Sequence, residues 1–139
     1  MTVVPDRLYM DENDRELYDR LDTTGVFKSS TRKEQFLFAL GMAFMRGIKR
    51  PIKKREGLFL AKDMRPQDEA LLNAVAVHHT DSVDVLADTA MVFKIAEQYA
   101  HAGIRLLVNE MESTQHGTFE KRLEKQLYEA GRELGLVND

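Results

Sequence analysis

Apolar residues recur every three or four positions over most of the chain, which is the period of an amphipathic helix. The pattern predicts helices over residues 12–21, 32–46, 66–81, 88–111 and 118–134, with a short helix at 82–87. Residues 7–10 (RLYM) alternate like a short strand. Residues 58–61 (LFLA) fit either a partner strand or a buried loop. We predict a mainly α fold: a single helical domain of five to six helices with a short N-terminal strand.

The segment after Thr31 carries the clearest helix signal. Thr31 and Glu34 have the spacing of a capping box, in which each side chain accepts a hydrogen bond from the other residue's backbone N–H. The sequence FLFALGMAFM that follows is apolar almost all round, so we expect this helix at the centre of the domain or at an oligomer interface. Gly41 costs about 1 kcal/mol relative to alanine within a helix, which indicates close packing of a neighbouring helix there.

Small residues also lie on one face of the helix at 88–111. Ala96, Ala100 and Gly103 would let a neighbouring helix approach closely. Residues 113–117 (STQHG) predict a hinge, which a charged amphipathic helix follows. We therefore divide the chain into a helical core domain at 1–112 and a hinge with a C-terminal amphipathic helix at 113–139. That helix either caps the domain or reaches to another subunit.

The formal net charge of −3 hides a strong segregation of charge along the chain. Residues 1–27 carry seven acids and three bases, residues 28–65 eleven bases and three acids, and residues 66–139 thirteen acids and six bases. The densest stretch, residues 46–55, has six bases and no acid. Such a block attracts phosphate whatever the total charge, because salt screens acids that lie beyond a Debye length of about 8–10 Å. The alternative is a solvated loop whose bases pair with the acidic C-terminal half.

A nucleic-acid interface is the site that this charge pattern predicts. Its contacts would be mainly electrostatic and would come from the dense basic stretch, with support from the start of the helix at 32–46. The candidate nucleic-acid-binding residues are Arg32, Lys33, Arg46, Lys49, Arg50, Lys53, Lys54 and Arg55.

The N-terminal order of strand, helix, turn and helix is also that of a ribbon-helix-helix module. In such a module the strand pairs with its dimer mate and enters the major groove, while the second helix meets phosphate with its N-terminus. Arg7 and Tyr9 would point outward from the strand, and the phosphate-facing helix start would carry Lys28, Ser30, Thr31, Arg32 and Lys33. A four-residue strand is also how many ordinary helical domains begin.

Signals for chemistry are scarce. The chain has no cysteine, which excludes disulfides, a thiol nucleophile and cysteine-based metal sites. It has no nucleotide-binding glycine loop and no GxSxG elbow. Glu97 and His101 are four residues apart on a predicted helix and are best explained as a surface pair rather than metal ligands. We therefore expect no enzyme activity, no catalytic residues, no metal and no cofactor. No apolar run is long enough to span a membrane, so we expect a cytoplasmic protein.

Several short motifs resemble a known family. These are Phe27-Lys28-Ser29-Ser30, Phe38-Ala39-Leu40-Gly41, residues 47–52 (GIKRPI), residues 72–77 (LNAVAV), Asp84-Val85-Leu86 and residues 96–104 (AEQYAHAGI). Together they are similar to the small accessory proteins associated with DNA phosphorothioation (Dnd) systems, over roughly residues 7–110. The resemblance implies an accessory role beside DNA sulphur-modification and restriction genes, in defence against foreign DNA. It implies no reaction and supplies no catalytic residues, and everything after Ser113 lies outside it.

Two functions follow from the charge pattern and the resemblance. The first is a non-enzymatic DNA-binding accessory or regulatory protein of a DNA-modification and phage-defence system. The alternative is a protein-interaction subunit of such a system, with no direct DNA contact, whose basic segment docks an acidic partner and whose C-terminal helix mediates assembly. The expected partners are DNA, held by salt-sensitive phosphate contacts, other defence-system proteins and further copies of the chain. No membrane partner is expected.

Overall fold

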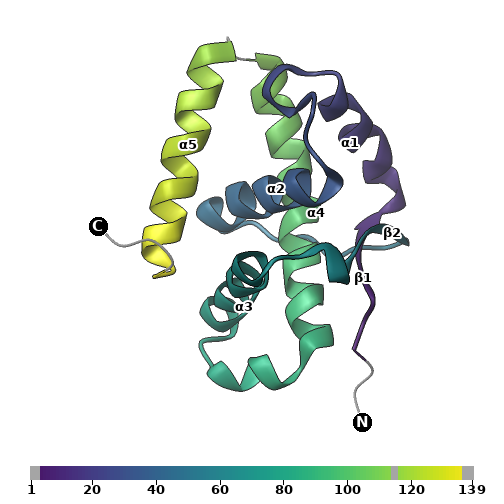
Figure 1. Cartoon of the computed structure of the whole chain (residues 1–139), viewed down its shortest axis with the longest axis vertical. Helices are drawn as coiled ribbons and strands as arrows, with labels where there is room; N and C mark the ends of the chain where they lie inside the picture. Colours follow the sequence, from purple (N-terminus) through teal and green to yellow (C-terminus); the bar gives the residue numbers. More distant parts are fainter. Residues whose placement is uncertain (1–3, 114–115, 136–139) are drawn as a thin grey trace.

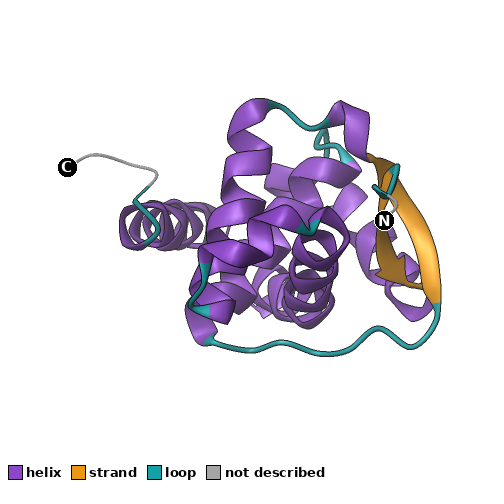
Figure 2. Ribbon diagram, turned by 90° about the horizontal axis from the view of Figure 1, so that it is seen from below, coloured by secondary structure: helices purple, strands orange, loops and turns teal. Residues whose placement is uncertain are grey.

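The computed structural model describes residues 4–113 and 116–135 and confirms a mainly helical fold (Figure 1). Five helices pack around a central crossing, and a two-stranded antiparallel sheet lies at one edge (Figure 2). The strands are β1 (Arg7–Asp11) and β2 (Arg55–Leu60), and the helices are α1 (Arg15–Asp22), α2 (Arg32–Arg46), α3 (Pro66–Thr80), α4 (Thr89–Ser113) and α5 (His116–Glu133). Single 3₁₀ turns, η1 (Glu12–Asp14), η2 (Gly25–Phe27), η3 (Ala61–Asp63) and η4 (Val83–Ala87), join several of them.

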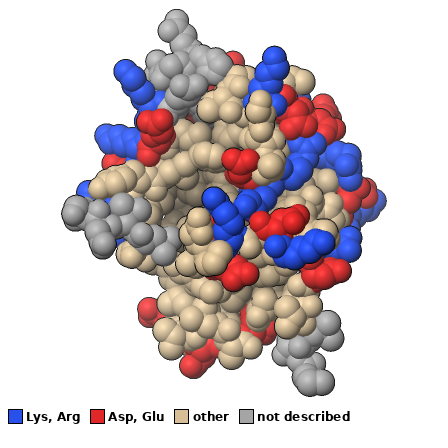
Figure 3. Space-filling view, in the orientation of Figure 1, with Lys and Arg blue, Asp and Glu red and all other residues tan. Residues whose placement is uncertain are grey.

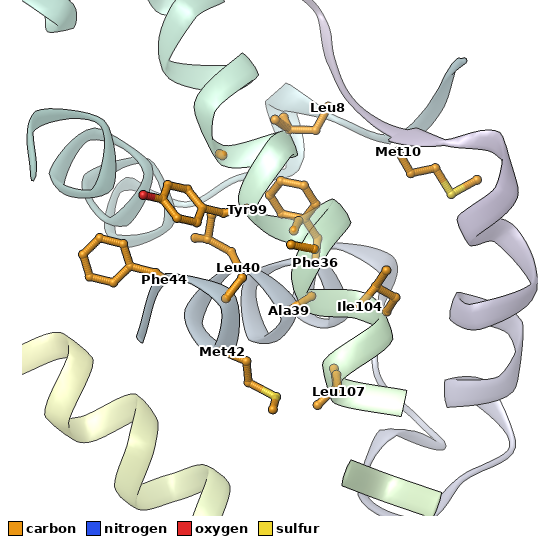
Figure 4. Close-up of a cluster of buried hydrophobic side chains, with 14 of the residues drawn as sticks. Leu8, Met10, Phe36, Ala39, Leu40, Met42, Phe44, Tyr99, Ile104 and Leu107 are labelled. Atoms are coloured by element: carbon orange, nitrogen blue, oxygen red, sulfur yellow. The ribbon is translucent and has the colours of Figure 1, made fainter. Parts of the chain in front are cut away.

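Helix α2 lies at the centre of the domain, as predicted. Its N-terminus is closed by the capping box: the Thr31 hydroxyl accepts from the Glu34 amide at 3.1 Å, and the Glu34 carboxylate accepts from the Thr31 amide at 3.0 Å. Gly47 ends the helix in the left-handed conformation, with φ 65°. Its core side chains, including Phe36 and Leu40, are fully buried against α4 (Figure 4).

The crossing of α2 and α4 depends on Gly103. A Cβ atom at this position would lie 1.7 Å from the backbone oxygen of Ala39, so no side chain fits between the two helices. The predicted close approach at the small residues of α4 is therefore confirmed, and its partner is α2. Gly41, on α2, faces α5 with a looser constraint: a Cβ there would lie 2.9 Å from Cδ2 of Leu127, the end of a flexible side chain.

Helix α5 packs against α2 of its own chain through Leu123, which is buried, and Leu127, which is half-buried. The predicted hinge covers residues 113–117; residues 114 and 115 lie outside the described part of the chain, α4 ends at Ser113 and α5 begins at His116. The division of the chain at residue 112 stays a prediction.

The second apolar run is a strand rather than a buried loop, and it starts earlier than expected, at Arg55. It pairs antiparallel with β1 in the register Arg7 to Leu60 and Asp11 to Arg55, with an irregularity between Leu8 and Tyr9. Because β1 finds its partner within the same chain, the ribbon-helix-helix arrangement, in which this strand would pair with a dimer mate, is not the one adopted. The intrachain pairing needs the long loop from α2, which local sequence order does not reveal.

Candidate nucleic-acid interface

The outer face of the sheet carries aromatic and basic side chains. Leu8 and Met10 of β1 are buried in the core, so the alternation of the strand turns Arg7 and Tyr9 outward, as predicted. The Arg55 guanidinium lies over the Tyr9 ring, 4.2 Å from its centroid, which is a cation–π contact.

Gly57 opposes Tyr9 across the sheet. A Cβ at Gly57 would lie 3.2 Å from Cδ of Arg7, so the glycine leaves room for the Arg7 side chain to lie across β2. The sheet therefore presents two guanidinium groups on one side, those of Arg7 and Arg55. The first of these also pairs with its neighbour Asp6 at 3.0 Å.

Residues 48–54, which we call the basic loop, join α2 to β2 along the outer edge of the molecule (Figure 2). Backbone hydrogen bonds hold the loop in place along its length. The Ile48 amide donates to the Ala43 carbonyl at 3.0 Å, the Arg50 amide to Gln98 O at 3.1 Å, and the Lys54 carbonyl accepts from Glu12 N at 2.9 Å. These hydrogen bonds hold the backbone of the basic loop in a defined position against α2, α4 and η1.

Asp11, which is buried at the end of β1, anchors the same loop. Its carboxylate accepts from the Lys53 amide at 2.9 Å and from the Asn13 amide at 3.0 Å. Burial works to raise the pKa of Asp11, but these amide hydrogen bonds, with a weaker one from Lys54, hold it below its ordinary value. A charged Asp11 therefore fixes where the loop begins to turn into β2.

The basic loop displays four of the eight predicted binding residues, and all four are exposed. The side chains of Arg50 and Lys53 make no hydrogen bond or ion pair with the described residues. Lys49 Nζ lies 3.0 Å from His79 Nε2, and Lys54 Nζ lies 3.4 Å from the Glu12 carboxylate, both partners being exposed. The Lys54–Glu12 ion pair is weak because it is open to water, and the Lys49–His79 contact is a hydrogen bond between two basic groups, so a phosphate competes readily with both.

The other four predicted residues are engaged within the fold. Lys33 pairs with the buried Asp68 at 2.8 Å, and Arg46 pairs with Glu110 at 3.0 Å. Arg32 is held by several groups of the α1 region, among them the carboxylates of Asp19 at 2.7 Å and Asp22 at 2.8 Å, and by Gln35 of its own helix. Arg55 pairs with Glu97 at 3.3 Å. The predicted set therefore separates into two groups. The four bases of the basic loop have no partner among the described residues or only an exposed one, whereas the other four each pair with an acid of the fold, although Arg46 and Arg55 are themselves exposed.

Glu97 and His101 do not form the expected surface pair. Glu97 is only 3 % exposed; it accepts from the Tyr9 amide at 2.9 Å as well as from Arg55. Burial raises its pKa to about 7, although the Tyr9 amide and Arg55 both act to lower it. His101 is held apart from it, with Nδ1 2.6 Å from the carboxylate of Asp14.

The reason for this correction is visible in the periodicity of α4. Glu97 lies four residues after Phe93 and seven before Ile104, on the apolar face, so its position signalled burial more strongly than its charge signalled exposure. Sequence reasoning also missed Asp11 as the anchor of the basic loop, because its partners are more than forty residues away.

The view of Figure 3 shows Lys and Arg atoms interspersed with Asp and Glu atoms over the upper and right-hand parts of the molecule. Within residues 4–113 and 116–135, no three His, Asp or Glu side chains are grouped so that they could hold a metal ion. No helix in the described part of the chain combines the length and the apolar character needed to cross a membrane.

Comparison with known proteins identifies one family. The family model of DNA sulphur modification system-associated protein 4 matches residues 7–133. No curated protein and no solved structure matches the chain. The match extends beyond the region of resemblance seen in the sequence and includes α5, so the expectation that everything after Ser113 falls outside the family was wrong. The chain belongs to the family of DNA sulphur modification system-associated protein 4.

Proposed function

We propose that this chain is a non-enzymatic, DNA-binding accessory or regulatory protein of a DNA sulphur-modification system and of the phage defence linked to it. The observation that carries the proposal is the basic loop, which holds four exposed cationic side chains within seven residues on a backbone fixed at several points. A fixed array of cations binds a polyanion with little ordering cost, because its backbone is already in place.

Contacts made by the basic loop would be to phosphate. Such contacts supply affinity and orientation but carry no sequence information. The outer face of the sheet, with Arg7 and Tyr9, lies beside the loop on the same strand pair and is the nearest surface available for base contacts. A two-stranded ribbon has dimensions that the major groove admits. Family membership supports DNA as the polyanion, because the family is associated with a system that modifies DNA.

Fluorescence anisotropy of labelled duplex and nicked DNA, titrated with protein at several salt concentrations, tests the proposal. Lys53→Ala with Lys54→Ala should weaken binding on all sequences and reduce the slope of log K against log salt by about 1.8 in magnitude, at about 0.9 for each phosphate contact. The matched control is Lys94→Ala with Arg105→Ala, which removes the same charge from two exposed positions on α4.

The control should bind like the wild-type protein. If micromolar wild-type protein leaves both DNAs unbound at low salt, the proposal fails. Equal losses in the two double variants would show instead that only total charge matters and that the basic loop is not the interface.

A further inference from the structure

A groove of about 590 Å³ lies between α3, η4 and the end of α5. Its apolar lining comes from Ala74, Val77, Leu86 and Leu134, and its acidic lining from Asp81 and Glu133. None of the described residues that line it is a lysine or an arginine. The groove therefore combines an apolar floor with negatively charged edges.

Turn η4 leaves large apolar side chains in water beside this groove. Val83 is 68 % exposed and Leu86 is 44 % exposed. Residues three apart in a 3₁₀ helix lie one above the other, so these two side chains share one side of the turn. Apolar side chains gathered at a groove and rimmed by polar groups are typical of a protein-interaction surface.

The charge around the groove is negative. Residues 80–93 contain three acids, Asp81, Asp84 and Asp88, and no base. The lower end of the molecule in Figure 3, where η4 and the start of α4 lie, shows Asp and Glu atoms among those of uncharged residues and His, and no Lys or Arg on this face. Glu133 Oε1 lies 3.7 Å from Nε2 of His78, which also lines the groove. A nucleic acid would be repelled by this end of the molecule.

Asp81 stands at a position where glycine is the ordinary residue. It ends α3 in the left-handed conformation, with φ 55°, and is the one non-glycine residue with positive φ in the described part of the chain. A glycine would adopt this conformation with less strain. The aspartate instead places a carboxylate on the wall of the groove, which allows folding and binding to be separated by substitution.

We propose that this groove docks a basic amphipathic helix from another protein of the DNA sulphur-modification system. The apolar stripe of such a helix would lie on Leu86 and Val77, and lysines or arginines beside the stripe would face Asp81 and Glu133. This is the helix-in-groove mode of recognition, in which apolar side chains spaced at helical intervals give affinity and the flanking charges give orientation. The inference rests on family membership and on the groove, and is independent of DNA binding by the basic loop.

The test uses the full chain and each of the other proteins of its sulphur-modification system, purified singly and titrated by calorimetry. Leu86→Asp should raise the Kd of the partner by about tenfold or more, because a charge would have to be buried at the contact. The matched control is Val26→Asp: Val26 is 43 % exposed on η2, at the opposite end of the molecule in Figure 1. The control should bind with the wild-type Kd.

Asp81→Gly separates binding from folding. It should raise the thermal midpoint or leave it unchanged, yet raise the Kd of the partner by about three- to tenfold and reduce the salt dependence of binding. Because Asp81 and Leu86 lie outside the basic loop, both groove variants should bind DNA as the wild-type protein does.

Four results would overturn the inference. The first is that no system protein binds the wild-type chain at 100 μM. The second and third are that Leu86→Asp leaves binding unchanged, or that Leu86→Asp and Val26→Asp weaken it equally. The fourth is that the wild-type chain associates with itself and that Leu86→Asp abolishes this association. The last result would assign the groove to a second copy. None of these results bears on the DNA titrations, so the two proposals fail separately.

Discussion

The buried carboxyl group of Glu97 should make the stability of the fold depend on pH near neutrality. Burial raises the pKa of Glu97 to about 7 in the folded protein, from an ordinary value of 4.5 in an unfolded chain. Between these two values the folded state holds a proton that the unfolded state has lost. Stability therefore falls as pH rises through this window, by about 3 kcal/mol in total at 1.36 kcal/mol for each unit of pKa difference.

Glu97→Gln is the informative perturbation. Glutamine keeps an oxygen that can accept from the Tyr9 amide, but it carries no charge at any pH. Over the range from pH 5 to pH 8, the free energy of unfolding of the wild-type chain minus that of Glu97→Gln should be highest at pH 5 and should fall by about 2.5 kcal/mol by pH 8, the rest of the loss lying below pH 5. Urea unfolding followed by circular dichroism at half-unit steps from pH 5 to pH 8 measures this difference.

The difference between the two proteins removes the contribution of other titrating groups. His79 is one such group: burial, Lys49 and His78 lower its pKa from 6.5, so it gives a slope of opposite sign below that pH. This slope is common to both proteins and cancels in the subtraction.

Arg55→Met provides the complementary test, because methionine keeps an apolar stem near Tyr9 but removes the cation that faces Glu97. It should cost little at pH 5, where Glu97 is protonated, and more at pH 8, where a buried carboxylate would be left without its cation. A wild-type minus Glu97→Gln difference that stays constant from pH 5 to pH 8 would refute the reasoning, because Glu97 would then be ionised throughout.

Four further substitutions test the packing and the anchors of the fold. Gly103→Ala places a methyl group against the backbone oxygen of Ala39 and should destabilise the protein by about 3 kcal/mol or more in thermal unfolding. Gly41→Ala meets only the end of the flexible Leu127 side chain, so it should destabilise the protein far less. Thr31→Ala removes half of the capping box and should lower the free energy of unfolding by about 1 kcal/mol in urea. Asp11→Ala should cost about 1–3 kcal/mol and speed amide exchange in the basic loop, whose amides lose their buried acceptor.

Features that depend on neighbouring residues could be predicted from the sequence. The capping box at Thr31 and the close approach at the small residues of α4 both follow from local patterns, and the structure confirms them. Local patterns leave open whether residues 58–61 form the partner strand of β1 or a buried loop, because β2 lies more than forty residues further along the chain than β1. The burial of Glu97 could be predicted only in part. Its position on the apolar face of α4 indicated a buried side chain, whereas a charged residue is usually exposed.

The candidate site shows a further limit of sequence reasoning, since charge blocks that stand apart along the chain are joined in the fold. Lys33 pairs with Asp68 and Arg55 pairs with Glu97, so a base from the middle block is held by an acid from the C-terminal block in each case. For such a base to contact phosphate, its acid must lose its partner, which is costliest at the buried Glu97.

Among the eight predicted bases, those that can reach a phosphate without this cost are the four of the basic loop. Four phosphate contacts give a slope of about −3.6 in log K against log salt, whereas contacts from all eight predicted bases would give about −7. The salt slope therefore reports which set binds. A slope near −7 would mean that the ion pairs of Arg32, Lys33 and Arg46 on α2 and of Arg55 on β2 break when DNA binds. DNA binding would then be coupled to a rearrangement of these side chains.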